Sequence, residues 1–140
     1  MNKIILIFIS VILLTSCTFK KEVSHTNINP EETLVNIYKD VTNEIEEYGV
    51  SEEKRDEAVK FLVENYNNYF KDNETMEKVY YYGNYLAKGY ANDEMKEYAL
   101  LGVDAYEAVK DVYCGRESKE NKLNIEFIKE TLNKLGYSVE

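Results

Sequence analysis

Apolar residues recur at helical spacing through most of this 140-residue chain. Between Pro30 and Gly49 successive apolar positions are separated by four, three, four and three residues, which places them on one face of an α-helix. These positions are Leu34, Tyr38, Val41, Ile45 and Tyr48. No stretch shows the sustained two-residue alternation of a half-buried strand. The pattern therefore predicts an all-α fold.

The residues at the two ends of this first segment are those that begin and end helices. Asn29 can cap the first turn, Pro30 suits the first helical position, and Glu32 lies three residues after the cap. Gly49 can adopt the left-handed backbone that often follows a helix. The sequence therefore predicts a helix over residues 30–48.

Four further segments show the same spacing and similar boundaries. Capping residues Ser51, Asp72-Asn73, Asn92-Asp93 and Ser118 precede them, and Gly115 and Gly136 follow the last two. The predicted helices cover residues 52–70, 74–90, 94–114 and 118–135. The stretch from 98 to 113 has a narrow polar stripe, so we expect it at the centre. Short connections predict one small antiparallel bundle of about five helices over residues 30–140.

Two glycines lie inside predicted helices, where glycine costs about 1 kcal/mol relative to alanine. Gly83 and Gly102 therefore each need a structural reason. One is a close crossing of two helices, since a missing side chain lets backbones approach. The other is a slot for a ligand, which would fit a small-ligand-binding or hydrolytic envelope lipoprotein with a pocket near Gly83 and Gly102.

The first residues of the chain have the order of an export signal. Lys3 precedes an apolar run from Ile4 to Leu14 that is interrupted only by Ser10, and small residues follow before Cys17. Even when extended to Phe19, the run falls short of the roughly 20 residues that cross a bilayer. Lys20-Lys21 then closes it.

Leu14-Thr15-Ser16-Cys17 resembles the lipobox of bacterial lipoproteins, residue by residue. The resemblance implies that residues 1–16 are a cleaved signal peptide and that Cys17 is the lipid-attachment site. Two or three acyl chains would hold the protein on the membrane, because a single chain binds only reversibly. The implied location is the extracytoplasmic face of a Gram-positive-like cell membrane. Residues 17–29, which lack hydrophobic periodicity, are predicted to form a flexible tether of about 20 Å.

The charge and motif content exclude several functions. With 26 acidic and 17 basic residues and a formal net charge of −9, the chain is poorly suited to nucleic acid. His25, the only histidine, lies in the tether, so no nucleophile–base pair can be assembled with it nearby. We expect no enzyme activity, no cofactor and no metal. Two alternatives stay open: Cys114 is either buried or reactive, and the acidic cluster Glu44–Glu57 is either a solvated face or a calcium site.

Tyrosine exceeds its usual frequency, with thirteen residues. Tyr81, Tyr82 and Tyr85 are expected to project to the sides of the predicted third helix, and Tyr66 and Tyr69 could extend the same patch. Tyrosine rings at bundle edges need no function, because a ring can be buried while its hydroxyl stays hydrated. The functional alternative is a recognition surface, since interfaces concentrate rigid aromatic side chains. These five tyrosines are our candidate partner-binding residues.

Two weaker resemblances bear on the role. The stretch from Tyr82 to Tyr137, including Leu101-Gly102-Val103-Asp104-Ala105, resembles helical segments in uncharacterised surface proteins of Gram-positive bacteria. Small acidic lipoproteins of this build also resemble exclusion and immunity factors, which block an incoming phage, conjugation apparatus or bacteriocin at the membrane. Together they imply a cell-surface module that contacts a protein partner, in an oligomeric state that the sequence leaves open.

Overall fold

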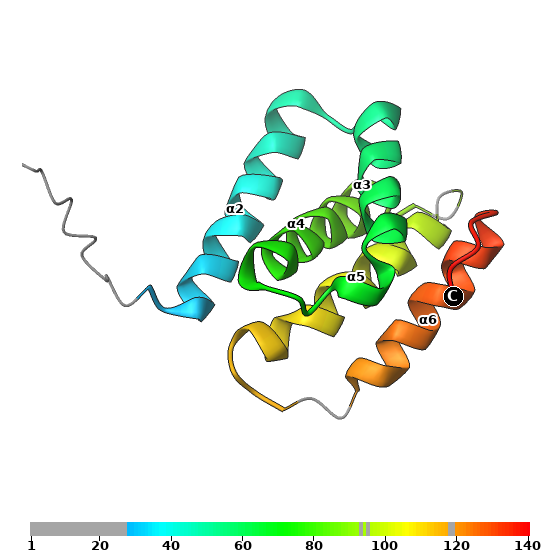
Figure 1. Cartoon of the computed structure of the whole chain (residues 1–140). Coiled ribbons are helices and arrows are strands. Elements are labelled where there is room, and N and C mark those ends of the chain that lie inside the picture. The colour runs from blue at the N-terminus through cyan, green and yellow to red at the C-terminus, as the bar shows by residue number, and fades with distance from the viewer. Residues whose placement is uncertain (1–27, 93, 95, 118–119) are drawn as a thin grey trace, which may run out of the picture.

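The computed structural model describes residues 28–92, 94, 96–117 and 120–140, and within them the chain is all-α (Figure 1). The helices are α2 (Pro30–Tyr48), α3 (Glu52–Glu64), the 3₁₀ turn η1 (Tyr66–Asn68), α4 (Asn73–Gly89), α5 (Lys96–Tyr113) and α6 (Asn121–Lys134). The predicted all-α, five-helix bundle is confirmed. Cys17, His25, Ser118 and the tether up to residue 27 lie outside the described residues.

Most of the predicted helix ends show the capping hydrogen bonds or glycine conformations that the sequence indicated. The side chains of Asn29, Ser51 and Asp72 each accept a hydrogen bond from a backbone N–H two or three residues later, at 2.7–3.1 Å. Gly49 and Gly115 have φ angles of 74° and 70°, in the left-handed region that glycine adopts readily. These local signals are sufficient to start and stop the helices because they satisfy backbone groups that the helix itself leaves free.

The second helix is shorter than predicted. It ends at Glu64, and the extension to residue 70 is wrong. Asn65 donates from its side-chain amide to the carbonyl of Phe61 at 3.0 Å, a local bond that competes with continued helix. The chain then turns through η1, and Tyr69 donates its hydroxyl to the carbonyl of Leu62 at 2.7 Å. Tyr69 thus reaches the core from a turn.

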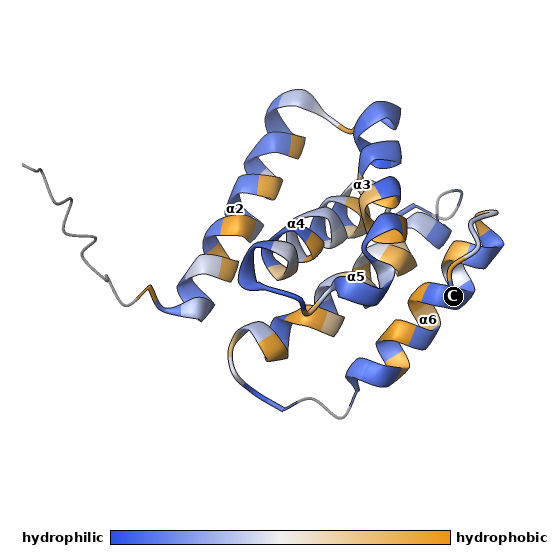
Figure 2. Cartoon of the chain, viewed as in Figure 1, coloured by the Kyte–Doolittle hydropathy of each residue, from blue (hydrophilic) through white to orange (hydrophobic). Residues whose placement is uncertain are grey.

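Helix α4 contacts α2, α3 and α5, and α6 packs on α5. In Figure 1, α2 and α3 form two arms joined at their upper end, with α4 crossing behind them. Figure 2 shows that the hydrophobic side of α2 faces this inner region. Helix α5 lies between α4 and α6 as expected, although α4 buries more residues, seven against five. The centre of the bundle is therefore the α4–α5 pair.

The two mid-helix glycines mark the point where α4 and α5 cross. A Cβ atom on Gly102 would lie 2.4 Å from both the Gly83 carbonyl oxygen and the Ala87 nitrogen. A Cβ atom on Gly83 would lie 2.8 Å from the Gly102 carbonyl oxygen. The predicted close crossing is confirmed. The alternative of a ligand slot at these glycines is wrong, because the neighbouring backbone fills the space.

Candidate functional site

The five candidate tyrosines do not form one surface. Tyr69 and Tyr85 are each only 1% exposed. Tyr85 accepts a hydrogen bond from the backbone N–H of Ser51 at 3.1 Å, so its ring is buried with the hydroxyl satisfied at the start of α3. The prediction that Tyr85 projects to the side of its helix is therefore wrong. Tyr69 and Tyr85 belong to the core and cannot contact a partner without unfolding.

Tyr66 is partly buried and lies against another element. Its hydroxyl donates to the backbone carbonyl of Ile125 in α6 at 3.1 Å. Its ring stands edge-on to Tyr69, with the centroids 6.0 Å apart. Tyr66 thus joins η1 to α6, whereas Tyr81 and Tyr82 contact α2 and α3.

Tyr81 and Tyr82 lie on α4 where it faces the two arms. The hydroxyl of Tyr81 donates to Glu44 of α2, and Glu44 also accepts from the Lys54 ammonium of α3 at 2.7 Å. The hydroxyl of Tyr82 donates to Glu57 of α3 at 2.5 Å. We call these five residues the tyrosine–carboxylate seam. Helices α2 and α3 both pack mainly on α4. The hydrogen bonds of the seam add polar links among all three helices.

Ring contacts hold the seam in one arrangement. Tyr81 and Tyr82 pack edge to face, with centroids 5.2 Å apart and planes at 76°. The Lys54 ammonium lies 5.0 Å from the Tyr81 ring centroid, within cation–π distance. The Phe61 ring also packs against Tyr82, with the ring centroids 5.1 Å apart. These contacts therefore restrain both rings in one arrangement.

The electrostatics of the seam keep the tyrosines protonated. Burial, and then the hydrogen bond to Glu57, raise the pKa of Tyr82 to about 12. Burial and the hydrogen bond to Glu44 also raise the pKa of Tyr81. Burial opposes ionisation of Glu44, but the hydrogen bonds from Lys54 and Tyr81 outweigh it and lower the pKa of Glu44. At neutral pH both phenols act as hydrogen-bond donors and Glu44 is an anion.

A cavity of about 240 Å³ lies beside the seam, between α2 and α4. We call it the α2–α4 groove; its lining residues are Ile37, Asp40, Glu74, Glu77, Lys78 and Tyr81. Lys78 pairs with Glu74 at 2.8 Å, and Glu77 accepts from the hydroxyl of Tyr113 at 2.5 Å. Small-molecule sites usually measure roughly 300–1,000 Å³. The groove is smaller, and its size suits a single side chain.

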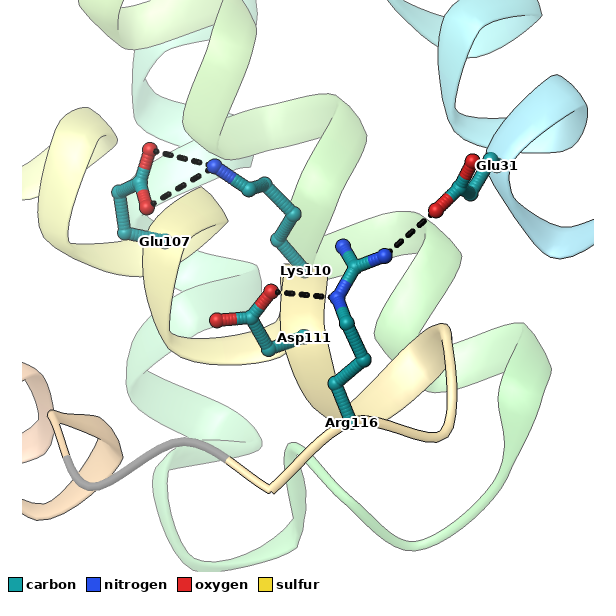
Figure 3. A network of polar contacts seen from close by, with 5 residues as sticks. All are labelled: Glu31, Glu107, Lys110, Asp111 and Arg116. Carbon is teal, nitrogen blue, oxygen red and sulfur yellow. Dashed lines mark hydrogen bonds and ion pairs between the residues drawn. The ribbon is translucent and has the colours of Figure 1, made fainter.

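Polar contacts also tie the start of α2 to the end of α5 (Figure 3). The guanidinium of Arg116 contacts Glu31 at 2.5 Å and Asp111 at 3.1 Å. Lys110 contacts both oxygens of Glu107 at 3.3 Å. A second cavity of about 160 Å³ lies here, but both cations in its lining are already paired with acids. This network therefore has a structural role in joining the two helix ends.

Cys114 lines this second cavity as a free, partly buried thiol. Burial is the main cause that raises the pKa of its thiol. A raised pKa keeps the group as a thiol at neutral pH, and the thiolate is the reactive form. Of the two alternatives, the structure favours the unreactive one.

The acidic cluster between Glu44 and Glu57 is spread over two helices and a turn. Glu44 pairs with Lys54, and Arg55 contacts Asp56 at 2.8 Å and Glu52 at 3.8 Å. The other acids of the cluster are exposed, as a solvated face requires. In the part of the chain that the structure describes, no three His, Cys, Asp or Glu residues are placed to hold a metal ion.

Comparisons with known proteins do not assign this chain to a family. No family model matches the chain, and no curated protein and no solved structure is significantly similar to it. Over the described residues, none of the helices combines the length and the apolar character needed to span a membrane.

Proposed function

We propose that this chain is a lipid-anchored interaction module on the extracytoplasmic face of the cell membrane, and that it binds a protein partner through the α2–α4 groove and Tyr81. The observation that carries the proposal is the groove itself, because it is sized for a side chain and bordered by a restrained ring. The lipobox ending at Cys17 supports the anchor.

The groove also indicates the chemistry of the partner side chain. Three carboxylates line it, from Asp40, Glu74 and Glu77, against the single ammonium of Lys78. This excess of negative charge favours a lysine or arginine from the partner. Restrained rings lower the entropy that binding must remove, so Tyr81 and Tyr82 suit a recognition surface. Exclusion of an incoming phage, conjugation apparatus or bacteriocin is a role that such a module would serve.

At the seam and at Cys114, binding is favoured over catalysis by the protonation state of the titratable groups. The seam phenols remain protonated, and the Cys114 thiol has a raised pKa. A general acid or base works best with a pKa near the working pH, and neither seam tyrosine has one. We therefore propose a non-enzymatic role.

The test is site-specific photocrosslinking in cells that produce the anchored protein. A benzophenone side chain at Lys78, on the groove, should give a discrete protein adduct. The same probe at Lys129, exposed on α6, serves as the control position. Adding Tyr81→Ala should weaken the adduct at least about tenfold, the loss typical of a hot-spot residue, while the helical content is retained. Equal adducts from both positions would contradict the groove.

The anchor is tested in the same cells. Cys17→Ala should release the protein from washed membranes and abolish the Lys78 adduct, without changing the thermal unfolding of the bundle. Retention in the membrane fraction after a high-salt wash would remove the lipoprotein assignment.

A further inference from the structure

Another cavity lies between α6 and Phe70, which follows the η1 turn. Its volume is about 290 Å³, and its lining residues are Phe70, Asn121, Lys122, Ile125 and Glu126. This volume is at the lower limit of small-molecule sites, which usually measure roughly 300–1,000 Å³. The cavity is therefore large enough for a molecule of the size of an amino acid. We call it the η1–α6 cavity.

Two apolar side chains line the η1–α6 cavity. The side chain of Phe70 is 41% exposed, although it is large and apolar. Ile125 is partly buried and packs against the core. Next to the cavity, Tyr66 of η1 donates its hydroxyl to the Ile125 carbonyl at 3.1 Å. This bond ties the η1 turn to the part of α6 that carries Ile125, so an apolar ligand group can pack between two restrained walls.

The lining also contains one cation and one anion without partners. Lys122 and Glu126 are exposed, and neither forms a hydrogen bond or an ion pair with a described residue. Because they are four residues apart on α6, they lie on the same face of the helix. Lys60 and Glu64 have the same spacing and order on α3, and they do form an ion pair, at 3.8 Å. Lys122 and Glu126 are therefore both available to a ligand.

The remaining lining residue has a buried polar atom without a partner. Among the described residues, Oδ1 of Asn121 is the only buried side-chain nitrogen or oxygen atom that makes no hydrogen bond. A buried acceptor without a donor destabilises the fold. A ligand that brings a donor into the cavity would remove this penalty. The atom therefore favours a ligand with an N–H or ammonium group.

We propose that the η1–α6 cavity binds a free amino acid with an apolar side chain. The ligand side chain packs between Phe70 and Ile125. Its α-carboxylate pairs with the Lys122 ammonium, and its α-ammonium group pairs with the Glu126 carboxylate. The Asn121 carboxamide turns toward the ammonium group, so that Oδ1 gains a donor.

The two unpaired charges decide among the occupants. A chain terminus of a partner protein brings only one charge, whereas a free amino acid brings both and so satisfies Lys122 and Glu126 together. The cavity volume also suits a molecule of this size. This site goes beyond the proposed function, because the α2–α4 groove belongs to different helices.

The test is an NMR titration of the lipidated protein in nanodiscs of a zwitterionic lipid, with empty nanodiscs as the blank. The ligands are L-phenylalanine, its amide, which lacks the carboxylate, and its N-acetyl derivative, which lacks the ammonium group. L-Phenylalanine should bind about threefold to fivefold more tightly than either analogue. Glycine, which has no apolar side chain, should bind about tenfold more weakly still. Chemical-shift changes should map to Phe70 and Ile125.

Each charged residue has a matched control on the same helix. Lys122→Gln should abolish the advantage of L-phenylalanine over its amide, and Glu126→Gln should abolish the advantage over the N-acetyl derivative. Lys129→Gln and Glu130→Gln remove exposed charges outside the cavity lining, so they should preserve both advantages. Asn121→Ala should weaken L-phenylalanine binding without lowering the melting temperature, because Oδ1 makes no hydrogen bond in the free protein.

Several results would overturn the proposal. Equal binding of L-phenylalanine and both analogues would show that neither charge of the ligand is recognised. Glycine that binds as tightly as L-phenylalanine would show that the apolar walls have no role. Chemical-shift changes that map to Ile37 and Tyr81 would place the ligand in the α2–α4 groove. A loss of preference with Lys129→Gln as large as with Lys122→Gln would also contradict this site.

Discussion

The α4–α5 crossing and the tyrosine–carboxylate seam hold helices together by different kinds of contact. At the crossing, Gly83 and Gly102 bring backbone against backbone with no side chain between them. At the seam, Tyr81 and Tyr82 reach from α4 to carboxylates on α2 and α3. Dispersion over close contacts holds the first, and hydrogen bonds and ion pairs hold the second. The crossing should therefore respond to added volume, and the seam to lost polar atoms and to pH.

The largest expected effect is a change of volume at the crossing. Gly102→Leu should lower the free energy of unfolding by about 3 kcal/mol or more, because the new side chain must displace the backbone of α4. Chemical denaturation followed by circular dichroism measures it. Gly89→Ala, also in α4, is the control, since its Cβ would meet the side chain of Val50 at 3.0 Å. If both variants are equally stable, the crossing is not as close as described.

The next effect separates core tyrosines from seam tyrosines. Tyr69→Phe should cost about 1–2 kcal/mol of unfolding free energy, because the buried carbonyl of Leu62 loses its side-chain donor. Tyr82→Phe should cost about 0.5 kcal/mol or less, since Glu57 is exposed and water can replace the hydroxyl. Thermal unfolding of the two variants gives the comparison. A greater loss at Tyr82 would show that the seam is part of the core.

The smallest effects concern two carboxylates with opposite pH dependence. Burial raises the pKa of Asp104 from 3.8 to about 6, so its charged form destabilises the fold above pH 6 and the penalty fades as the pH falls toward 4. Asp104→Asn should therefore stabilise the protein at pH 7, by about 1 kcal/mol once solvent screening is allowed for, and have little effect below pH 4.

Glu44 provides the matched comparison. Its pKa is lowered, so it stabilises the fold above its unfolded pKa, near 4.5, and this contribution is lost as the pH falls through the folded value. Glu44→Gln should destabilise the protein at pH 7 by about 0.5 kcal/mol, with a smaller difference in acid. Urea denaturation of both variants between pH 3 and 8 is the measurement. Curves that shift in the same direction would contradict the assigned environments.

Local sequence signals were sufficient to predict where the helices occur, but they did not predict the length of every helix. Caps such as Ser51 act on backbone groups within one turn, so the sequence alone reveals them. The end of α3 at Glu64 depends on Asn65, which competes for the Phe61 carbonyl, and on Tyr69, which returns to Leu62. The apolar spacing through residue 70 is equally compatible with a continued helix, so spacing alone does not locate that break.

By itself, the sequence determined the helical class and showed that Gly83 and Gly102 each need a structural reason, because apolar spacing is encoded by neighbouring residues and a mid-helix glycine has an intrinsic cost. Only the tertiary structure decided which tyrosines are buried and which carboxylates have partners. Tyr85 and Tyr81 stand one helical turn apart on α4, yet one meets the start of α3 and the other meets Glu44. Asp104 resembles any helix-surface acid in the sequence. Its isolation depends on distances between side chains of different helices, which no local pattern encodes.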